Sequence, residues 1–373
     1  MSATNTVPPL DVANALAGLD RTPRILAVEP SGPARIVIFR RDESGDVVRE
    51  ETEFQPWLLA TRSEPWAALR TVTDIRELEG DQPLRYLVSF STWSSFQDAV
   101  RAAHDANESF FRVNSVVDQY LMRSGRTLFK EMVFEDLRRV QLDIETTGLD
   151  PAADDSRIII AALRSADGEE IVVSARSEEA LLSDLSAALT RLDPDVIERH
   201  NVFNFDLPFI LERAARWSVP LNWGRDGSLV RLGARRQRVR VGPLSHSYQP
   251  AYIFGRHIVD TYQQIQRYDV AGRLTSYGLK PAVEALGLTR SDREFVPGDQ
   301  IRDVWRSDPD RLLRYAVDDV RDVLAAKFSE VFDRELVPRA DTLRLVKVIV
   351  TDGERVLLLG PSGAGKSTLV NSV

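Results

Sequence analysis

The stretch Val140–Asp150 begins as an apolar strand, and this strand ends in two acidic residues, Asp143 and Glu145. Residues two apart in a strand point to the same face, so we expect these two carboxylates side by side. Two like charges at that separation are costly unless a cation holds them, and oxygen ligands of this kind suit Mg²⁺ or Mn²⁺. The pair alone is not specific, because exposed strand faces often carry acids.

A further acid, Asp206, lies in the stretch His200–Leu211, which follows the predicted fourth strand of this region. Pro208 fits the first turn of a helix, so Asp206 is expected close to the start of that helix. The simpler interpretation is that Asp206 is the N-cap of the helix. A ligand role is compatible with it, since a helix N-terminus also attracts anionic phosphate.

The last acid, Asp319, falls in a stretch where apolar residues recur at helical spacing, which predicts an amphipathic helix. These apolar residues are Leu312, Leu313, Ala316, Val320 and Val323. Tyr315 and Asp319 are four residues apart and share a face, whereas Asp318 points elsewhere. The alternative is a solvated acidic stripe paired with Arg314 and Arg321.

The apolar pattern also predicts the elements that must position these acids. After the strand with Asp143, two strands are joined by a turn at Asp167–Gly168, and a helix over 177–192 follows with Ser177 as its N-cap. A strand at Val196 then leads into further strands alternating with helices. This order predicts a mixed sheet flanked by helices, in a domain over residues 136–340.

A smaller mixed α/β domain is predicted over residues 24–135, after a flexible tail at 1–23. Its predicted strands and helices are strands at 25–28, 35–39, 47–54 and 85–90, and helices at 66–78 and 94–107.

Composition narrows the class of protein. The chain has 373 residues, 43% hydrophobic and 28% charged, which is ordinary for a globular protein with two domains. It contains no cysteine, which excludes disulfides, thiolate zinc sites and a cysteine nucleophile. No apolar run is long enough to cross a membrane and no signal peptide is evident, so we expect a cytoplasmic protein. The net charge of -8 has the wrong sign for a protein that binds nucleic acid, but a sum over the whole chain can conceal local regions of positive charge.

The three acidic stretches together resemble the exonuclease motifs of the DEDD superfamily. They read Asp143-x-Glu145, Asn201-x-x-x-Phe205-Asp206 and Tyr315-x-x-x-Asp319. The tyrosine subclass fits, because the histidine type would need His at position 314, which is Arg314 here. Flanking stretches resemble the 3′–5′ proofreading exonuclease of family B DNA polymerases. Those stretches are Asn201–Phe209, Trp223–Gly227, Gly255–Tyr262 and Ser276–Gly287.

This resemblance spans roughly residues 24–340. It implies a ribonuclease H-like mixed five-stranded sheet flanked by helices, preceded by a smaller mixed α/β domain. It also implies hydrolysis of DNA from 3′ ends with two Mg²⁺ or Mn²⁺ ions. The polymerase palm and fingers of that family do not follow, so we expect either a stand-alone exonuclease or a piece of a longer protein.

The resemblance assigns a role to each site residue. Asp143 would bridge both ions, Glu145 and Asp319 would complete the first ion's site, and Asp206 would serve the second ion. Tyr315 would orient the attacking water, because a phenol with a pKa of about 10 is a poor base.

The resemblance further implies contacts with single-stranded or frayed 3′ ends of DNA. Asn201 and Phe205 would position the terminal nucleotide, and Leu149 would wedge against its base.

A basic stretch lies between the second and third motifs. Residues 225–240 contain six arginines but one acid, Asp226, and the alternation at Leu229–Leu232 and Arg238–Gly242 predicts a β-hairpin. Arginines of this hairpin suit contacts with backbone phosphates. The candidate contacts are Arg231, Arg235, Arg236 and Arg238. The alternative is a solubilising basic edge strand.

Near the C-terminus a strand pattern leads into a sequence that resembles a Walker A phosphate-binding loop and then a helix start. The candidate nucleotide-binding residues are Gly360, Gly363, Gly365, Lys366, Ser367 and Thr368. Only seven residues follow Lys366. We therefore expect residues 341–373 to be an incomplete P-loop segment, which binds ATP or GTP only if further sequence completes it.

The sequence thus predicts a metal-dependent 3′–5′ exodeoxyribonuclease, with a polymerase or ATPase as the candidate partner and no membrane contact. The alternative function is a non-catalytic DNA-binding module of a polymerase-like or P-loop ATPase assembly. Converging carboxylates would support the first function, and carboxylates splayed apart or capped by arginines would support the second.

Overall fold

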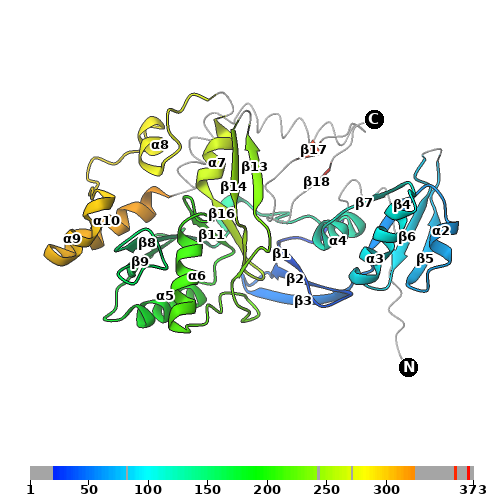
Figure 1. The fold of residues 1–373 in the computed structure, drawn as a ribbon, viewed down its shortest axis with the longest axis horizontal. Helices are drawn as coiled ribbons and strands as arrows, with labels where there is room; N and C mark the ends of the chain where they lie inside the picture. The colour runs from blue at the N-terminus through cyan, green and yellow to red at the C-terminus, as the bar shows by residue number, and fades with distance from the viewer. Residues whose placement is uncertain are drawn as a thin grey trace. The chain divides into compact units, whose positions relative to one another are not determined.

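The computed structural model describes residues 20–80, 83–241, 244–269 and 272–323, together with the short strands β17 (Leu357–Leu358) and β18 (Thr368–Leu369) (Figure 1). Within these ranges, residues 20–132 belong to one compact unit and residues 133–323 to another. Each unit is described by itself below.

The first unit contains two antiparallel sheets. One has the order β1-β2-β3, and the other has the order β5-β6-β4-β7. The strands are β1 (Ile25–Pro30), β2 (Arg35–Arg41), β3 (Val47–Glu53), β4 (Trp57–Ala60), β5 (Val72–Glu77), β6 (Tyr86–Phe90) and β7 (Phe110–Arg112). The helices are α2 (Glu64–Ala67), α3 (Trp93–Asp105) and α4 (Val116–Ser124).

The predicted helix over 66–78 is wrong. Helix α2 ends at Ala67, and residues 72–77 form strand β5, which pairs with β6. Two β-branched side chains, Val72 and Ile75, pack against the core of the second sheet. Tertiary packing of these stiff side chains therefore outweighs the helical spacing of the apolar residues.

The second unit is built on a five-stranded sheet with the order β10-β9-β8-β11-β16, of which Figure 1 labels β9, β8, β11 and β16. The strands are β8 (Arg139–Thr146), β9 (Ile158–Ser165), β10 (Glu170–Val173), β11 (Val196–Arg199) and β16 (His257–Asp260). β9 runs antiparallel to β8 and β10, whereas β11 runs parallel to β8 and β16. The predicted fold class, a mixed five-stranded sheet flanked by helices, is confirmed.

Strict alternation along the central strand β8 separates two faces. Val140, Leu142 and Ile144 pack into one core with helices α5 (Glu178–Leu192) and α6 (Asp206–Trp217). The odd-numbered positions are polar although they are buried: Arg139, Gln141, Asp143 and Glu145. They face the side of the sheet on which Ile160 and Ala162 pack against helix α10 (Pro309–Asp322). The sheet therefore turns its acids toward α10.

Helix α10 and helix α9 (Ile301–Ser307) pack on that second face. The unit also contains α7 (Thr261–Tyr268), α8 (Leu279–Ala285) and the 3₁₀ helices η1 (Phe134–Asp136) and η2 (Gly298–Gln300). Among the helices that the structure describes, none combines the length and the apolar character needed to cross a bilayer.

The basic stretch forms two paired ladders rather than the predicted pairing within residues 229–242. β12 (Arg231–Leu232) pairs with β15 (Ala251–Tyr252), and β13 (Gln237–Val241) pairs with β14 (Leu244–Tyr248). Each basic strand finds its partner downstream because residues such as Tyr248 and Ala251 are buried and anchor that side. We call residues 231–252 the basic arm.

Five of the predicted nucleotide-binding residues, Gly360, Gly363, Gly365, Lys366 and Ser367, lie outside the described residues, as does most of the predicted tail at 1–23. The backbone of Thr368 is in β18, which pairs with β17 in antiparallel fashion. A strand therefore stands where the Walker A pattern predicts the first turn of a helix.

A buried ion pair between Glu178 and Arg213 connects helices α5 and α6 to strand β9. Glu178, at the start of α5, accepts hydrogen bonds from the backbone N–H of Ile158 (2.7 Å), the Nε of Arg213 (2.9 Å) and the Nε1 of Trp217 (2.7 Å). The side chains of Glu178 and Arg213 are 2% and 3% exposed. Loss of either partner would leave a buried charge without compensation.

We expect Glu178→Ala to lower the free energy of unfolding by about 3–5 kcal/mol, the usual cost of breaking a buried ion pair. The control is Glu169→Ala, since Glu169 pairs with Arg191 on the surface, where such pairs contribute about 1 kcal/mol or less. Urea denaturation followed by circular dichroism compares the two. Equal losses in the two variants would contradict the proposed fastening role.

A buried carboxylate also joins the ends of the two parallel strands β11 and β16. Asp260 is the N-cap of α7, and its Oδ1 accepts hydrogen bonds from the backbone N–H of Asn201 (2.7 Å) and Tyr262 (3.0 Å). Burial raises the pKa of Asp260 from 3.8 to about 7, although these hydrogen bonds oppose the shift. Folding therefore favours the protonated form of this group.

We expect the difference in stability between Asp260→Asn and the wild-type protein to depend on pH. The folded pKa of Asp260 is raised, so its contribution to stability is present at low pH and is lost as pH rises through about 7. Asparagine keeps the acceptor oxygen without the charge, so the variant should gain roughly 2–3 kcal/mol relative to wild type between pH 5 and pH 8. Urea denaturation at both values measures this.

The matched control for that experiment is Asp310→Asn, because Asp310 is exposed in the first turn of α10. A stability difference that stays constant from pH 5 to pH 8 in Asp260→Asn would rule out a protonated Asp260.

Candidate metal centre

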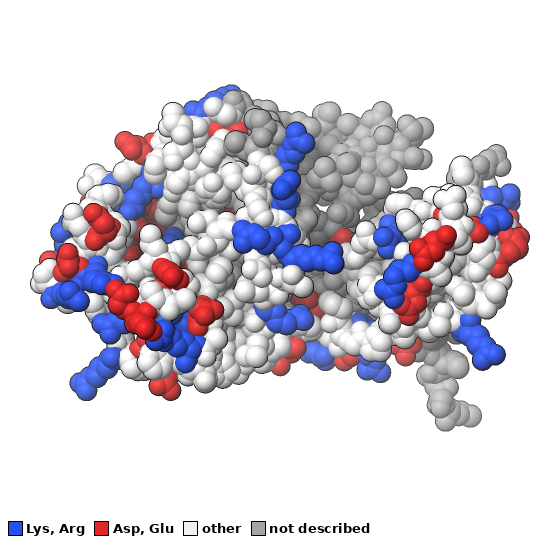
Figure 2. Space-filling view, viewed as in Figure 1, with Lys and Arg blue, Asp and Glu red and all other residues white. Residues whose placement is uncertain are grey.

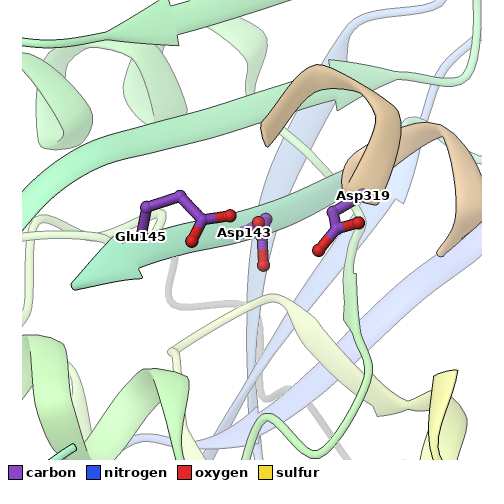
Figure 3. A group of neighbouring side chains, drawn as sticks. All are labelled: Asp143, Glu145 and Asp319. Carbon is purple, nitrogen blue, oxygen red and sulfur yellow. The ribbon is translucent and has the colours of Figure 1, made fainter. Parts of the chain in front are cut away.

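Three of the four predicted metal ligands come together in the structure. Asp143 and Glu145 project from the same face of β8, and Asp319 approaches them from α10 (Figure 3). One carboxylate oxygen from each lies within 4.8 Å of the others, and all three residues are buried. Two full charges at that distance repel by about 3 kcal/mol at an effective dielectric constant of ~20. The cluster is therefore a place where a cation would be stabilised.

Burial sets the protonation of these acids. It raises the pKa of Asp143, and the positive charge of Arg199 opposes that rise. Burial also raises the pKa of Glu145 well above its ordinary value, and the charge of Asp143 adds to the shift. A divalent cation would reverse both effects, because it replaces the lost hydration with direct oxygen coordination.

The fourth predicted ligand, Asp206, is not part of this cluster of three. It is the first residue of α6, and the N-cap position is occupied by Phe205, so the N-cap interpretation of Asp206 is wrong. The Oδ1 of Asp206 instead accepts a hydrogen bond from the Nε of Arg199 at 2.8 Å. The same guanidinium pairs through its Nη2 with Asp143. Arg199 thus lies between Asp143 and Asp206.

A second arginine, Arg293, contacts the cluster through Asp319. Arg293 pairs with Asp319 and also with Asp322, one turn further along α10. Its side chain is 9% exposed, so the pair is shielded from water. Asp318 faces away from the cluster as predicted, toward Arg290, Arg321 and the backbone N–H of Glu294. Helix α10 thus directs Asp319 toward the cluster and Asp318 toward the arginines around it.

The predicted water-positioning residue, Tyr315, lies on the same face of α10 as Asp319. Its hydroxyl accepts a hydrogen bond from the Nζ of Lys280 at 2.5 Å, and that ammonium lies 4.5 Å from the centre of the Tyr315 ring. Burial raises the pKa of Tyr315, and the charge of Asp319 raises it further. Tyr315 therefore stays protonated, which suits positioning rather than base chemistry.

The three residues predicted to contact the end of a DNA strand lie in different settings. Leu149 follows β8 and is 83% exposed, which is unusual for a leucine. Asn201 has a left-handed backbone with φ of 63° at the turn between β11 and α6. Phe205 is half-buried against the core and lies 5.6 Å from the ring of Phe209. Leu149 is thus the one of the three that offers a free apolar surface.

The predicted phosphate contacts lie on the surface of the basic arm. Arg231, Arg235, Arg236 and Arg238 are all exposed, and Figure 2 shows Lys and Arg side chains gathered over the strands that Figure 1 labels β13 and β14. Arg225, just before the arm, is different, because its side chain is 4% exposed and pairs with Asp193 and Asp195. The arm therefore presents positive charge to solvent, whereas Arg225 supports the loop beneath it.

Three residues that contact the site were not singled out in the sequence: Arg199, Lys280 and Arg293. A signal for Arg199 exists, because an arginine at the end of an otherwise buried parallel strand demands a buried anionic partner. Lys280 lies in the stretch Ser276–Gly287, whose resemblance to the polymerase family was a signal, whereas Arg293 lies in a stretch without regular spacing; only the fold brings the two residues to α10.

Comparison with protein families finds a match in the middle of the chain. Residues 152–281 match the family model described as DNA polymerase family B, exonuclease domain. The match includes Arg199, Asp206 and Lys280, and it begins after Glu145 and ends before Tyr315. The three-carboxylate cluster is therefore supported by the fold rather than by the matched residues.

The chain is also similar to several DNA polymerases. It is 28% identical over 234 residues to a DNA polymerase of Archaeoglobus fulgidus, covering 60% of this chain and 26% of that protein. It is 24% identical over 363 residues to DNA polymerase 1 of Pyrococcus abyssi, covering 88% of this chain and 44% of that protein. With the DNA polymerase delta catalytic subunit of Caenorhabditis elegans it shares 31% identity over 156 residues, which are 40% of this chain and 14% of that subunit.

Among solved structures, the fold is similar to that of the family B DNA polymerase from the hyperthermophilic archaeon Pyrobaculum calidifontis. The TM-score is 0.61 at 21% identity, over 84% of this chain and 45% of the polymerase. The chain thus spans less than half the length of each of these relatives. Residues 152–281 thus match the exonuclease domain of family B DNA polymerases in sequence, and the fold of the chain is similar to that of such a polymerase.

Proposed function

We propose that this chain is a metal-dependent 3′–5′ exonuclease that removes nucleotides from single-stranded or frayed DNA ends. The observation that carries the proposal is the buried cluster of Asp143, Glu145 and Asp319 at the centre of a fold of the polymerase exonuclease type. A polymerase that delivers the 3′ end is the partner that the relatives suggest.

The residues of this cluster fit a single Mg²⁺ or Mn²⁺ ion. Their donors are all carboxylate oxygens, which hard divalent cations prefer, and the three ligand atoms lie within 4.8 Å of one another. Burial without a cation disfavours their charged forms, as the raised pKa values of Asp143 and Glu145 indicate. Metal affinity and carboxylate ionisation are therefore coupled in this site.

The proposed reaction adds one water across the bond between phosphorus and the 3′ oxygen. The water oxygen bonds to phosphorus, that P–O bond breaks, and one water proton ends on the departing 3′ oxygen. A divalent ion held in the cluster would polarise the phosphodiester and activate the attacking water. Asp143, Glu145 and Asp319 would hold the ion, and Tyr315, fixed by its hydrogen bond from Lys280, would position the water.

The DNA strand itself would be held outside the cluster. The arginines of the basic arm suit contacts with backbone phosphates, which are independent of sequence and weaken with salt. The exposed side chain of Leu149 suits an apolar contact with the terminal base, and Asn201 and Phe205 lie beside the helix that carries Asp206.

A second candidate function is a non-catalytic DNA-binding module. One specific observation favours it, because Arg199 and Arg293 pair with three of the four predicted ligands, Asp143, Asp206 and Asp319. In such a module the arginines would replace metal ions altogether, and the acids would serve the stability of the fold.

We expect Asp143→Asn to lower the rate of metal-dependent cleavage by at least ~10²-fold, the size expected when one preorganised electrostatic contact is lost. DNA binding should persist, because the phosphate contacts lie on the basic arm. The measurement is a time course with 3′-labelled and 5′-labelled single-stranded DNA in Mn²⁺. Immediate release of the 3′ label with a ladder from the 5′ label identifies the polarity.

The matched control is Asp318→Asn, since Asp318 is adjacent to Asp319 but faces Arg290 and Arg321. It should retain activity, and EDTA should abolish activity in both proteins. DNA binding without any metal-dependent cleavage by the wild-type chain would reject the exonuclease and favour the module.

We expect replacement of Arg235, Arg236 and Arg238 by Ala to weaken DNA binding, most strongly at low salt. Three lost phosphate contacts should reduce the slope of log K against log salt by about 2 for single-stranded DNA. Fluorescence anisotropy across a salt series measures this slope. Arg62, Arg85 and Arg101, which are exposed and paired with acids in the first unit, provide a control triple variant with the same change in charge. An unchanged slope in the arm variant would remove the arm from the binding surface.

A further inference from the structure

The two-ion arrangement implied by the family resemblance requires Asp143 to be shared by both ions and Asp206 to hold the second. In this structure the space between those two carboxylates is taken by the guanidinium of Arg199. Its Nε donates to the Oδ1 of Asp206 at 2.8 Å, and its Nη2 pairs with the Oδ1 of Asp143. The residues present therefore do not fit a second ion there.

Geometry makes the two arrangements exclusive. A Mg²⁺ ion needs its ligand oxygens at about 2.0–2.1 Å in a near-octahedral arrangement. The Oδ1 of Asp206 already accepts the hydrogen bond from Arg199, and the Oδ1 of Asp143 pairs with the same guanidinium, so an ion bridging these two oxygens would have to displace Arg199. The Oδ2 of Asp206 is buried without a hydrogen-bond partner. Asp143 is left to contribute to the cluster with Glu145 and Asp319. An ion can be held on that side of Asp143 while Arg199 stays in place.

The charges of these residues also favour Arg199 over a second ion. Arginine cannot lose its proton in a protein, so Arg199 is a permanent positive charge. Burial would lower its pKa, but the charges of Asp143 and Asp206 outweigh burial and raise it. Its side chain is 12% exposed, whereas those of Asp143 and Asp206 are 1% and 0% exposed. Ejecting Arg199 would leave two buried carboxylates to be neutralised by the incoming ion alone.

The surrounding residues keep Arg199 in position. It is the last residue of β11, which is paired on both sides, with β8 and with β16. The next residue, His200, is neutral, because burial first and the charge of Arg199 second lower its pKa to about 3. The Nδ1 of His200 forms a hydrogen bond with the Oγ1 of Thr261 at 3.1 Å. Arg199 is thus the cation that the structure assigns to this pair of acids.

We propose that this exonuclease site takes a single divalent ion, held by Asp143, Glu145 and Asp319, and that the guanidinium of Arg199 replaces the second ion beside Asp206. The inference rests on the proposed exonuclease function and concerns how its site is built. Arg199 supplies one fixed positive charge where a second ion would supply two, and Asp206 orients that charge rather than binding metal.

The test is a count of bound Mn²⁺ on the full chain, by titration with the EPR signal of free Mn²⁺ as the readout. The wild-type protein should bind one ion. Asp206→Asn should also bind one ion, because Asp206 is not a ligand. Arg199→Ala removes the guanidinium and frees both carboxylates, so the count should rise to two. Arg199→Ala/Asp206→Asn should return the count to one.

Arg302→Ala is the matched control, since Arg302 pairs with the exposed Asp155 outside the cluster. Two ions on the wild-type protein, falling to one in Asp206→Asn, would overturn the inference while leaving the exonuclease intact. A count that stays at one in a folded Arg199→Ala would overturn it as well. No bound ion and no cleavage by the wild-type protein would instead reject the proposed function, and the inference with it. If Arg199→Ala does not fold, the wild-type and Asp206→Asn counts decide alone.

Discussion

Repulsion among buried carboxylates is the constraint on which the second unit depends. Asp143, Glu145, Asp206 and Asp319 are all buried, and each would be more stable in water as an isolated charge. The fold tolerates them only because cations reach them from several elements: Arg199 from β11, Arg293 from the segment before η2, and Lys280 from α8, close to Glu145. The three-carboxylate cluster keeps a deficit of positive charge, and that deficit is the physical basis of metal affinity.

The same sheet separates this polar group from a conventional core. Leu142 and Ile144 alternate with Asp143 and Glu145 on β8, so one face of the strand packs against α5 and α6 while the other carries the acids. The antiparallel partner β9 supplies Ile160 and Ala162 to that second face, and α10 closes over them. Asp319 therefore reaches the cluster because the apolar stripe of α10, Leu312 and Ala316 in particular, docks on β9.

Much of this could be predicted from the residues. The alternation in β8, the turn at Gly168, the N-cap at Ser177 and the apolar spacing in α10 are local signals, and the structure agrees with them. The stretch at 72–77 could not be predicted, because its pairing with β6 is a tertiary effect. The position of Arg199 between Asp143 and Asp206 could not be predicted either. The family resemblance implies that Asp206 and Asp143 share a site, but only the packed structure places the guanidinium of Arg199 between them.

The alternation along β8 has a consequence for how such a chain can change over evolution. A strand with two buried faces of opposite chemistry admits many substitutions but no change of length. One residue inserted between Arg139 and Thr146 would exchange the faces, placing Leu142 beside α10 and an acid in the apolar core. Insertions and deletions should therefore accumulate in the loop at 147–157 and be absent from β8, even in relatives whose residues there have diverged.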